Sequence, residues 1–286
     1  MLHGKPPSSR PPPGDQGERL EHARGELRDA LGAARNLEQL LRSVKTGPRA
    51  LRALIPDAAA SCQVARRALE TLLESLRAAI ADRGPVDALE RFVLPRTAEL
   101  EQALERAANG PMNAKNRLAL ESVVSRAWRQ IDAARELIGL FEDAIWSPRI
   151  RLDLAELVRE TSKPETRPRQ SALIRATLRV PPPAVEVLVH PRAAMTLLEL
   201  IVNLVAASRG GAEPHIVIHG EGPCGFSVQR EAADGEPLTL PSRPLIAPAL
   251  ECMRAVASIS EAKLEVDAQQ LAASLFWQPE ACGGRG

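Results

Sequence analysis

Residues 196–208 read Thr-Leu-Leu-Glu-Leu-Ile-Val-Asn-Leu-Val-Ala-Ala-Ser, and this stretch decides the fold of the second half of the chain. Its apolar side chains recur at helical spacing, while Glu199 and Asn203 lie one turn apart on the same face. One interpretation is that both polar side chains simply face solvent, as most such groups on helices do. The segments on either side of the helix give the pair a second interpretation.

Composition bounds what the chain can be. Its 286 residues are enough for two domains, and a formal net charge of +1 gives no global field that would attract nucleic acid or an acidic membrane. Most of the 37 basic residues are arginine, a bias that we attribute to genome composition rather than to phosphate binding. The four cysteines form no Cys-x-x-Cys pair, which fits a reducing compartment. Because we find no signal peptide and no membrane-spanning segment, we expect a cytoplasmic protein.

Proline and glycine divide the chain into four regions. Residues 1–14 are proline-rich and predict a disordered tail, and residues 280–286 predict a flexible one. Residues 15–147 contain four long stretches of apolar residues at threes, fours and sevens, separated by Gly-Pro dipeptides and closed by Ser-Pro. They predict an antiparallel helical bundle, with a kink or a break at Pro56 and a bend at Pro95.

Residues 148–279 have a different texture, in which short alternating stretches are interspersed with helices. The pattern predicts a strand leading into a helix over residues 150–160, and further strands over residues 174–180 and 185–190. It also predicts two hairpins, 215–219 with 226–230 and 263–267 with 271–277, and a helix over 244–258 between them. These elements predict an α/β sandwich in which helices cover one face of a mixed, mostly antiparallel sheet.

The order of these elements resembles the catalytic core of bacterial two-component sensor histidine kinases. The phrases that carry the resemblance are Ile150–Val158, His190–Arg192 with Leu197–Asn203, and Ala249–Ile259 with Lys263–Val266. In that family a helical dimerisation and phosphotransfer domain precedes an ATP-binding domain of the GHKL (Bergerat) class. The resemblance, which covers residues 113–279, implies an α+β multidomain protein and a homodimer formed through the bundle. The alternative is a four-helix monomer, which would bury the same apolar faces.

The resemblance also implies roles for the polar pair. At the position of Asn203, working kinases hold Mg²⁺ against the nucleotide phosphates, and the residue at the position of Glu199 orients water or the metal. An amide oxygen together with substrate phosphates suits Mg²⁺, which prefers oxygen ligands and keeps several waters. Asn203 is therefore the candidate metal and cofactor ligand, and Glu199 the candidate catalytic residue.

The rest of the nucleotide site is degenerate. Arg230 stands where the family has the aspartate that reads adenine, and a guanidinium has no acceptor for an amino group. Asp234 and Gly235 are the nearest remnant of that motif, and residues 244–250 replace the second glycine box with a segment that contains two prolines. The segment that forms the ATP lid is truncated. We therefore expect no cofactor, or ATP with Mg²⁺ if the remnant site functions.

The phosphoacceptor is altered as well. Residues 26–32 resemble the family's acceptor phrase Glu-Leu-His-Asp, but Arg28 replaces the histidine and cannot form a phosphoramidate. His22, with Glu21 and Glu26 near it on the helix, is the remaining candidate phosphoacceptor. The alternative interpretation is that His22 is an ordinary surface histidine.

Three functional hypotheses follow. The first is a degenerate kinase or phosphotransferase-like adaptor that binds a response-regulator receiver domain or a partner kinase, and the degenerate glycine boxes favour it. The second is an active ATP-dependent sensor histidine kinase, which the pair Glu199 and Asn203 favours. The third is a non-catalytic helical scaffold with an α/β cap. None of them includes a nucleic acid as partner.

Overall fold

The computed structural model describes residues 14–43, 47–162, 176–179, 184–206, 213–220, 223–230, 246–267 and 272–277. The chain divides into two compact units, and the division falls between Gly139 and Leu140, inside a long helix. Each unit buries its own set of apolar side chains. The two predicted tails lie outside the described residues, except that Gly14 already belongs to the first helix.

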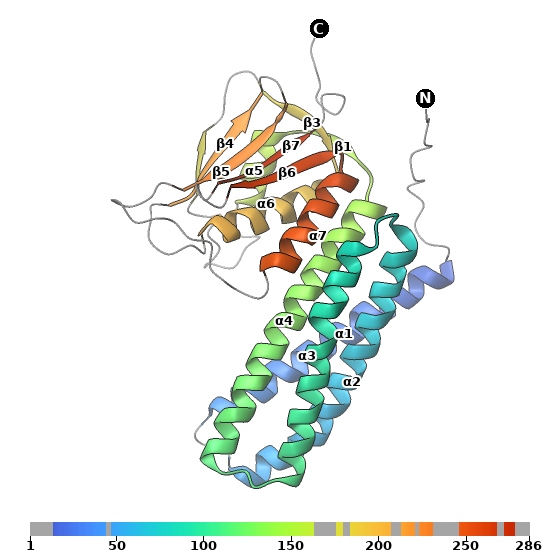
Figure 1. Cartoon of the computed structure of the whole chain (residues 1–286), viewed down its shortest axis with the longest axis vertical. Coiled ribbons are helices and arrows are strands. Elements are labelled where there is room, and N and C mark those ends of the chain that lie inside the picture. Colours follow the sequence, from blue (N-terminus) through green and yellow to red (C-terminus); the bar gives the residue numbers. More distant parts are fainter. Residues whose placement is uncertain are drawn as a thin grey trace. The chain divides into compact units, whose positions relative to one another are not determined.

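The first unit is made of long helices joined by short connectors, as the periodicity predicts (Figure 1). The bounds are α1 (Gly14–Arg42), α2 (Pro48–Ala79), α3 (Gly84–Asn109) and α4 (Ala114–Trp146), of which α4 continues into the second unit. Gly47 is the extended N-cap residue of α2, and Pro48 takes the first helical position. A proline is favourable there because the N–H that it lacks would have no partner within the helix.

Pro56 and Pro95 lie inside α2 and α3, and both helices are continuous through them. Of the two effects predicted for Pro56, a break is therefore not seen. A proline inside a helix typically costs ~3 kcal/mol, so other interactions must hold the two sides together. In α2 these are apolar contacts, since Leu51 and Ile55 on one side of the proline and Cys62 on the other are all buried. Tertiary packing thus outweighs the local cost.

The core of the helical unit follows the predicted seams. For the first helix, the spacing by threes, fours and sevens predicts a seam of Leu20, Leu27, Leu31, Ala34, Leu37, Leu41 and Val44. All of these residues are buried except Val44, which lies outside the described residues. Burial of one such leucine stabilises the fold by roughly 1.5–3 kcal/mol relative to exposure, so the seam outweighs weak local propensities. Among the described residues, no helix combines the length and the apolar character that crossing a membrane requires.

In its described residues, the second unit combines strands with three shorter helices. Its elements are β1 (Ile150–Asp153), α5 (Leu154–Thr161), β2 (Thr177–Arg179), β3 (Glu186–Val189), α6 (Pro191–Ala206), β4 (His215–His219), β5 (Gly225–Gln229), α7 (Ile246–Ile259), β6 (Ala262–Asp267) and β7 (Ala272–Trp277). Five strands form one sheet in the order β2-β4-β5-β7-β6, and β1 pairs with β3 in a separate antiparallel pair. Both predicted hairpins are confirmed, β4 with β5 and β6 with β7.

The sheet is mixed because β2 pairs with β4 in parallel, while the other pairs are antiparallel. Helices α6 and α7 lie along one side of it (Figure 1). The side chains on one face of β4, β5 and β7 are buried: Ile216, Ile218, Phe226, Val228, Ala273 and Leu275. The predicted α+β class, with N-terminal helices followed by a mixed, mostly antiparallel sheet, is therefore confirmed. The predicted truncated lid, between β5 and α7, lies outside the described residues.

An arginine on α4 caps the C-terminal end of α1. Arg117, in the first turn of α4, donates from Nε to the carbonyl oxygen of Leu41 at 2.7 Å and from Nη2 to that of Leu40 at 3.2 Å. It also donates to the carbonyl of Ser43. The last carbonyls of a helix have no intrahelical donor, so Arg117 satisfies groups at the end of α1 that would otherwise need water.

We expect Arg117→Met to lower the free energy of unfolding by about 1–2 kcal/mol, because several hydrogen bonds from a charged donor are lost while the apolar stem is kept. Urea unfolding followed by circular dichroism measures the change. Arg126→Met is the matched control on the same helix, since Arg126 is exposed and forms a surface ion pair with Glu99. It should cost no more than about 0.5 kcal/mol. Equal losses in the two variants would contradict the capping role.

Candidate functional site

Helix α6 presents the polar pair from a well-anchored element. Its apolar residues are buried in the core of the second unit: Ala193, Ala194, Leu197, Leu198, Ile201, Val202 and Val205. Glu199 is half-buried and Asn203 is exposed, one turn apart, as their spacing predicts. The amide of Asn203 is therefore accessible to a ligand or to solvent, from a helix whose position the core fixes.

Arg230 lies directly after β5 and reaches the end of the same helix. Its Nη1 donates to the carbonyl oxygen of Ala206, the last residue of α6, at 3.1 Å. Carbonyls at a helix C-terminus carry partial negative charge, so a cation is favoured at this place and a carboxylate is not. The position at which the resemblance expects an adenine-reading aspartate is thus occupied by a residue that caps α6.

The residues present fit a Mg²⁺-nucleotide only in part. Asn203 offers an amide oxygen of the type that Mg²⁺ accepts, and Glu199 is its neighbour on the helix. Arg230 has only donors and is hydrogen-bonded to the end of α6, so it cannot accept a hydrogen bond from an adenine amino group. Asp234 and Gly235 lie outside the described residues. Of residues 244–250, which replace the second glycine box, residues 246–250 form the start of α7.

His22 lies on α1 and faces solvent. Its side chain is 77% exposed, and Nε2 is 3.4 Å from Oε1 of Glu26, one turn further along the helix. Glu21 is ion-paired with Arg24 rather than with His22. A neighbouring carboxylate can accept a hydrogen bond from one ring nitrogen and thereby orient the ring. Arg28, which replaces the family's histidine, is also exposed. His22 and the polar pair of α6 belong to different units.

A serine and a histidine meet on the sheet, a pairing that the sequence analysis missed. Nε2 of His219 is 2.8 Å from Oγ of Ser227, and the imidazole ring packs against Phe276 with the ring centroids 5.5 Å apart. Ser227 is only 2% exposed, so its hydroxyl is closed to substrates and the pair is structural. The alternating pattern of the hairpin could have indicated this pair. It places His219 and Ser227 on the same face, and the register makes them diagonal neighbours, which interact across strands.

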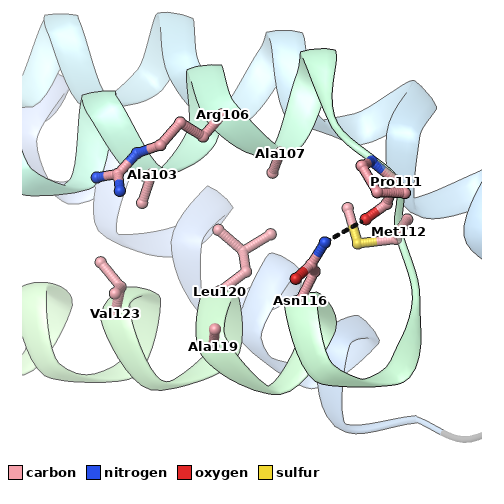
Figure 2. Close-up of a pocket in the computed structure, with 9 residues that line it drawn as sticks. All are labelled: Ala103, Arg106, Ala107, Pro111, Met112, Asn116, Ala119, Leu120 and Val123. Atoms are coloured by element: carbon pink, nitrogen blue, oxygen red, sulfur yellow. Dashed lines mark hydrogen bonds between the residues drawn. The ribbon is translucent and has the colours of Figure 1, made fainter.

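The described part of the helical unit has a small apolar pocket between the end of α3 and the start of α4, with a volume of about 270 Å³ (Figure 2). Its two polar residues are Arg106 and Asn116. Arg106 donates from Nε to the carbonyl of Gln102 at 3.1 Å, and Asn116 donates from Nδ2 to the carbonyl of Pro111 at 2.7 Å. Both side chains are hydrogen-bonded to nearby backbone carbonyls, so neither is directed at a ligand. We interpret the pocket as imperfect packing beside the α3–α4 connector.

The buried cysteines have no reactive character. Burial raises the pKa of the Cys62 thiol and that of the Cys252 thiol to about 12, so both stay protonated near neutral pH. Neither is in a disulfide, and Cys224 is likewise buried and outside any disulfide. Within the described residues, no group of three or more histidine, cysteine or acidic side chains is arranged to hold a metal ion.

Comparison with known proteins finds matches among solved structures. No family model and no curated protein matches the chain. Among solved structures, the chain is similar to the histidine kinase AdeS of Acinetobacter baumannii, with 13% identity and a TM-score of 0.40. The match covers 63% of this chain and 92% of that one. At this distance the likeness does not transfer an activity.

We expect Arg230→Met to destabilise the second unit by about 1 kcal/mol, because the carbonyl at the end of α6 loses a charged donor. Arg254→Met is the matched control, since Arg254 is an exposed arginine on α7, in the same unit. It should change the free energy of unfolding by less than about 0.5 kcal/mol. Urea unfolding of both variants tests the difference, and an Arg230→Met protein as stable as wild type would show that the cap contributes nothing.

Proposed function

We propose that the chain is a signalling protein built on the architecture of a two-component histidine kinase core, which binds a response-regulator receiver domain or a partner kinase and does not turn over ATP. The hydrogen bond from Arg230 to the carbonyl of Ala206 carries this proposal. It gives the side chain at the expected adenine-reading position a structural task and a charge opposite to that of the family's aspartate.

The architecture supports the first half of the proposal. Four long helices precede an α/β unit whose element order follows the resemblance, including a short strand and helix at its start and a hairpin at its end. A helical surface of this length suits docking of a second protein and association of two copies. Dimerisation through the helices belongs to the proposal, as does the partner.

A variant of the proposal adds phosphotransfer through His22. In this step an imidazole nitrogen attacks the phosphorus of an aspartyl phosphate on the receiver, the P–O bond to the aspartate breaks, and a P–N bond forms. The exposure of His22 and the position of the Glu26 carboxylate, 3.4 Å from Nε2, support it, because the ring is accessible and the carboxylate can orient it.

The active kinase is the competing function, and the exposure of Asn203 beside Glu199 favours it. The two readings differ in nucleotide binding. A ligand that binds only the folded state stabilises it by RT ln(1 + [L]/Kd), which is about 2.7 kcal/mol at a hundredfold excess over Kd. For a protein of this size that corresponds to a shift in Tm of several degrees.

We expect millimolar ATP with Mg²⁺ to leave the Tm of the full chain unchanged within about 1 °C, because adenine has no acceptor at Arg230. Differential scanning fluorimetry measures the shift. Asn203→Ala is the matched control, since removing an exposed amide should not alter stability but would remove the candidate Mg²⁺ ligand. A rise in the Tm of the wild type that Asn203→Ala abolishes would reject the proposal in favour of the active kinase.

We expect His22→Ala to prevent transfer of labelled phosphate from a phosphorylated receiver domain to the chain. Arg28→Ala, at another exposed position of α1, is the matched control and should keep the transfer. Autoradiography with and without acid treatment identifies the bond, because acid hydrolyses a phosphoramidate and leaves phosphoesters intact. Undiminished labelling of the His22→Ala protein would discard the phosphotransfer variant, while the binding proposal is tested by co-purification with the receiver.

A further inference from the structure

A partly buried network joins three segments of the second unit that are far apart in sequence. Arg149 lies in the connector between α4 and β1, His190 between β3 and α6, and Glu261 in the turn between α7 and β6. Nε of Arg149 is 3.2 Å from Nε2 of His190, Nη1 is 2.9 Å from Oε1 of Glu261, and Nη2 donates to the carbonyl of Ile259 at 3.1 Å. Nδ1 of His190 is 2.7 Å from the carbonyl oxygen of Ser147.

The partners of His190 determine its protonation. A carbonyl only accepts, so Nδ1 must carry the hydrogen that faces Ser147. A guanidinium only donates and is always charged, so Nε2 must offer its lone pair to Arg149. Both nitrogens are thus assigned, and the ring is neutral. A second proton on Nε2 would face a donor hydrogen and place one cation against another.

The charges around the ring act in the same sense. Within the described residues, the charged groups that face His190 are Arg149, from the connector, and Glu261, from the turn after α7. Burial and the nearby guanidinium hold the pKa of His190 below its ordinary value, against the opposing effects of the Ser147 carbonyl and of Glu261. His190 is only 8% exposed, so solvent does little to relieve a second charge.

The network also involves the helix of the candidate site. The carbonyl of His190 accepts the N–H of Ala194 at 2.9 Å, so His190 is the residue from which α6 begins. Arg149 satisfies the last carbonyl of α7, and Glu261, which it pairs with, has φ at 54° in the tight turn that follows. A displacement of the connector therefore affects contacts at the start of α6 and at the end of α7.

We propose that Arg149 and His190 form a clasp that fixes the connector after α4 to the start of α6 and the end of α7, and that protonation of His190 opens it. Opening breaks the bond from Arg149 to Nε2, and repulsion between the two cations displaces the connector. By linkage, anything that displaces the connector also raises the affinity of His190 for a proton. The clasp is independent of the proposed function, since it uses neither Asn203, Glu199 nor His22.

The clasp makes stability depend on pH in a stated direction. The pKa of His190 is lower in the folded than in the unfolded chain, so the unfolded chain binds more protons in the window between the two values. The contribution of the neutral ring is fully present above the unfolded-state value of about 6.5. It is lost as the pH falls from there toward the folded-state pKa and then levels off.

Hydrogen exchange of the full-length protein tests the clasp. After correction for intrinsic rates, the peptide spanning residues 147–152 should exchange about tenfold faster at about pH 5 than at neutral pH, the factor expected for one lost hydrogen bond of a charged group. His190→Gln keeps one donor and one acceptor without titrating, so its connector should show no such acceleration. His22→Gln, at an exposed histidine, is the matched control and should behave as wild type.

A wild-type connector whose exchange does not respond to acid would overturn the proposal, as would an acid response that survives in His190→Gln or disappears in His22→Gln. Arg149→Met provides a second measurement that does not require the His190 variant to fold. Removing the cation should raise the pKa of His190, read from its imidazole resonances by NMR, and should speed connector exchange at neutral pH. An unchanged His190 pKa in Arg149→Met would also overturn the clasp.

Discussion

The need to satisfy carbonyl groups at helix ends shapes this molecule more than any other single constraint. The last turn of every helix leaves carbonyls without intrahelical donors. In α1, α6 and α7 the donor is an arginine from another part of the chain: Arg117, Arg230 and Arg149 respectively. Arginine suits this task because its planar fork directs several donors at once and never loses its charge. The arginine excess, which composition alone led us to attribute to genome bias, therefore has structural uses that became visible only with the tertiary contacts.

The elements of the fold could be predicted because their signals are local. Helical seams, Gly-Pro boundaries and alternating hairpins are written within short windows, and the structure reproduces them to within a few residues. The parallel pairing of β2 with β4 and the separate pair of β1 with β3 could not be predicted, because alternation states which face a residue takes but not which strand lies beside it. Whether Pro56 would kink or break α2 could not be decided for a similar reason, since the apolar contacts that stabilise the helix on both sides of the proline come from elsewhere in the unit.

In the candidate site, too, the features set by local sequence could be predicted and those set by tertiary contacts could not. The spacing of Glu199 and Asn203 was sufficient to place both on one face of α6, and alternation was sufficient to place Arg230 at the end of β5, but their roles stay predictions. The hydrogen bond from Arg230 to Ala206 was not predictable, because it depends on β5 ending beside the C-terminus of α6. Asp234 and Gly235 lie outside the described residues, so the glycine box that they represent stays a prediction too.

Helix α6 is held at both ends by groups of the protein itself. His190 fixes its start through the clasp, and Arg230 caps its last residue. The position of Asn203 therefore does not depend on a bound ligand, because core packing and the contacts at both helix ends already determine it. A preformed surface of this kind favours binding, since a partner meets no ordering cost there, whereas an ATP site also requires recognition of the base, and Arg230 has no acceptor for it. The clasp also couples the connector after α4 to the surface around Asn203. A shift of Arg149 acts on His190, and His190 begins the helix that carries Asn203.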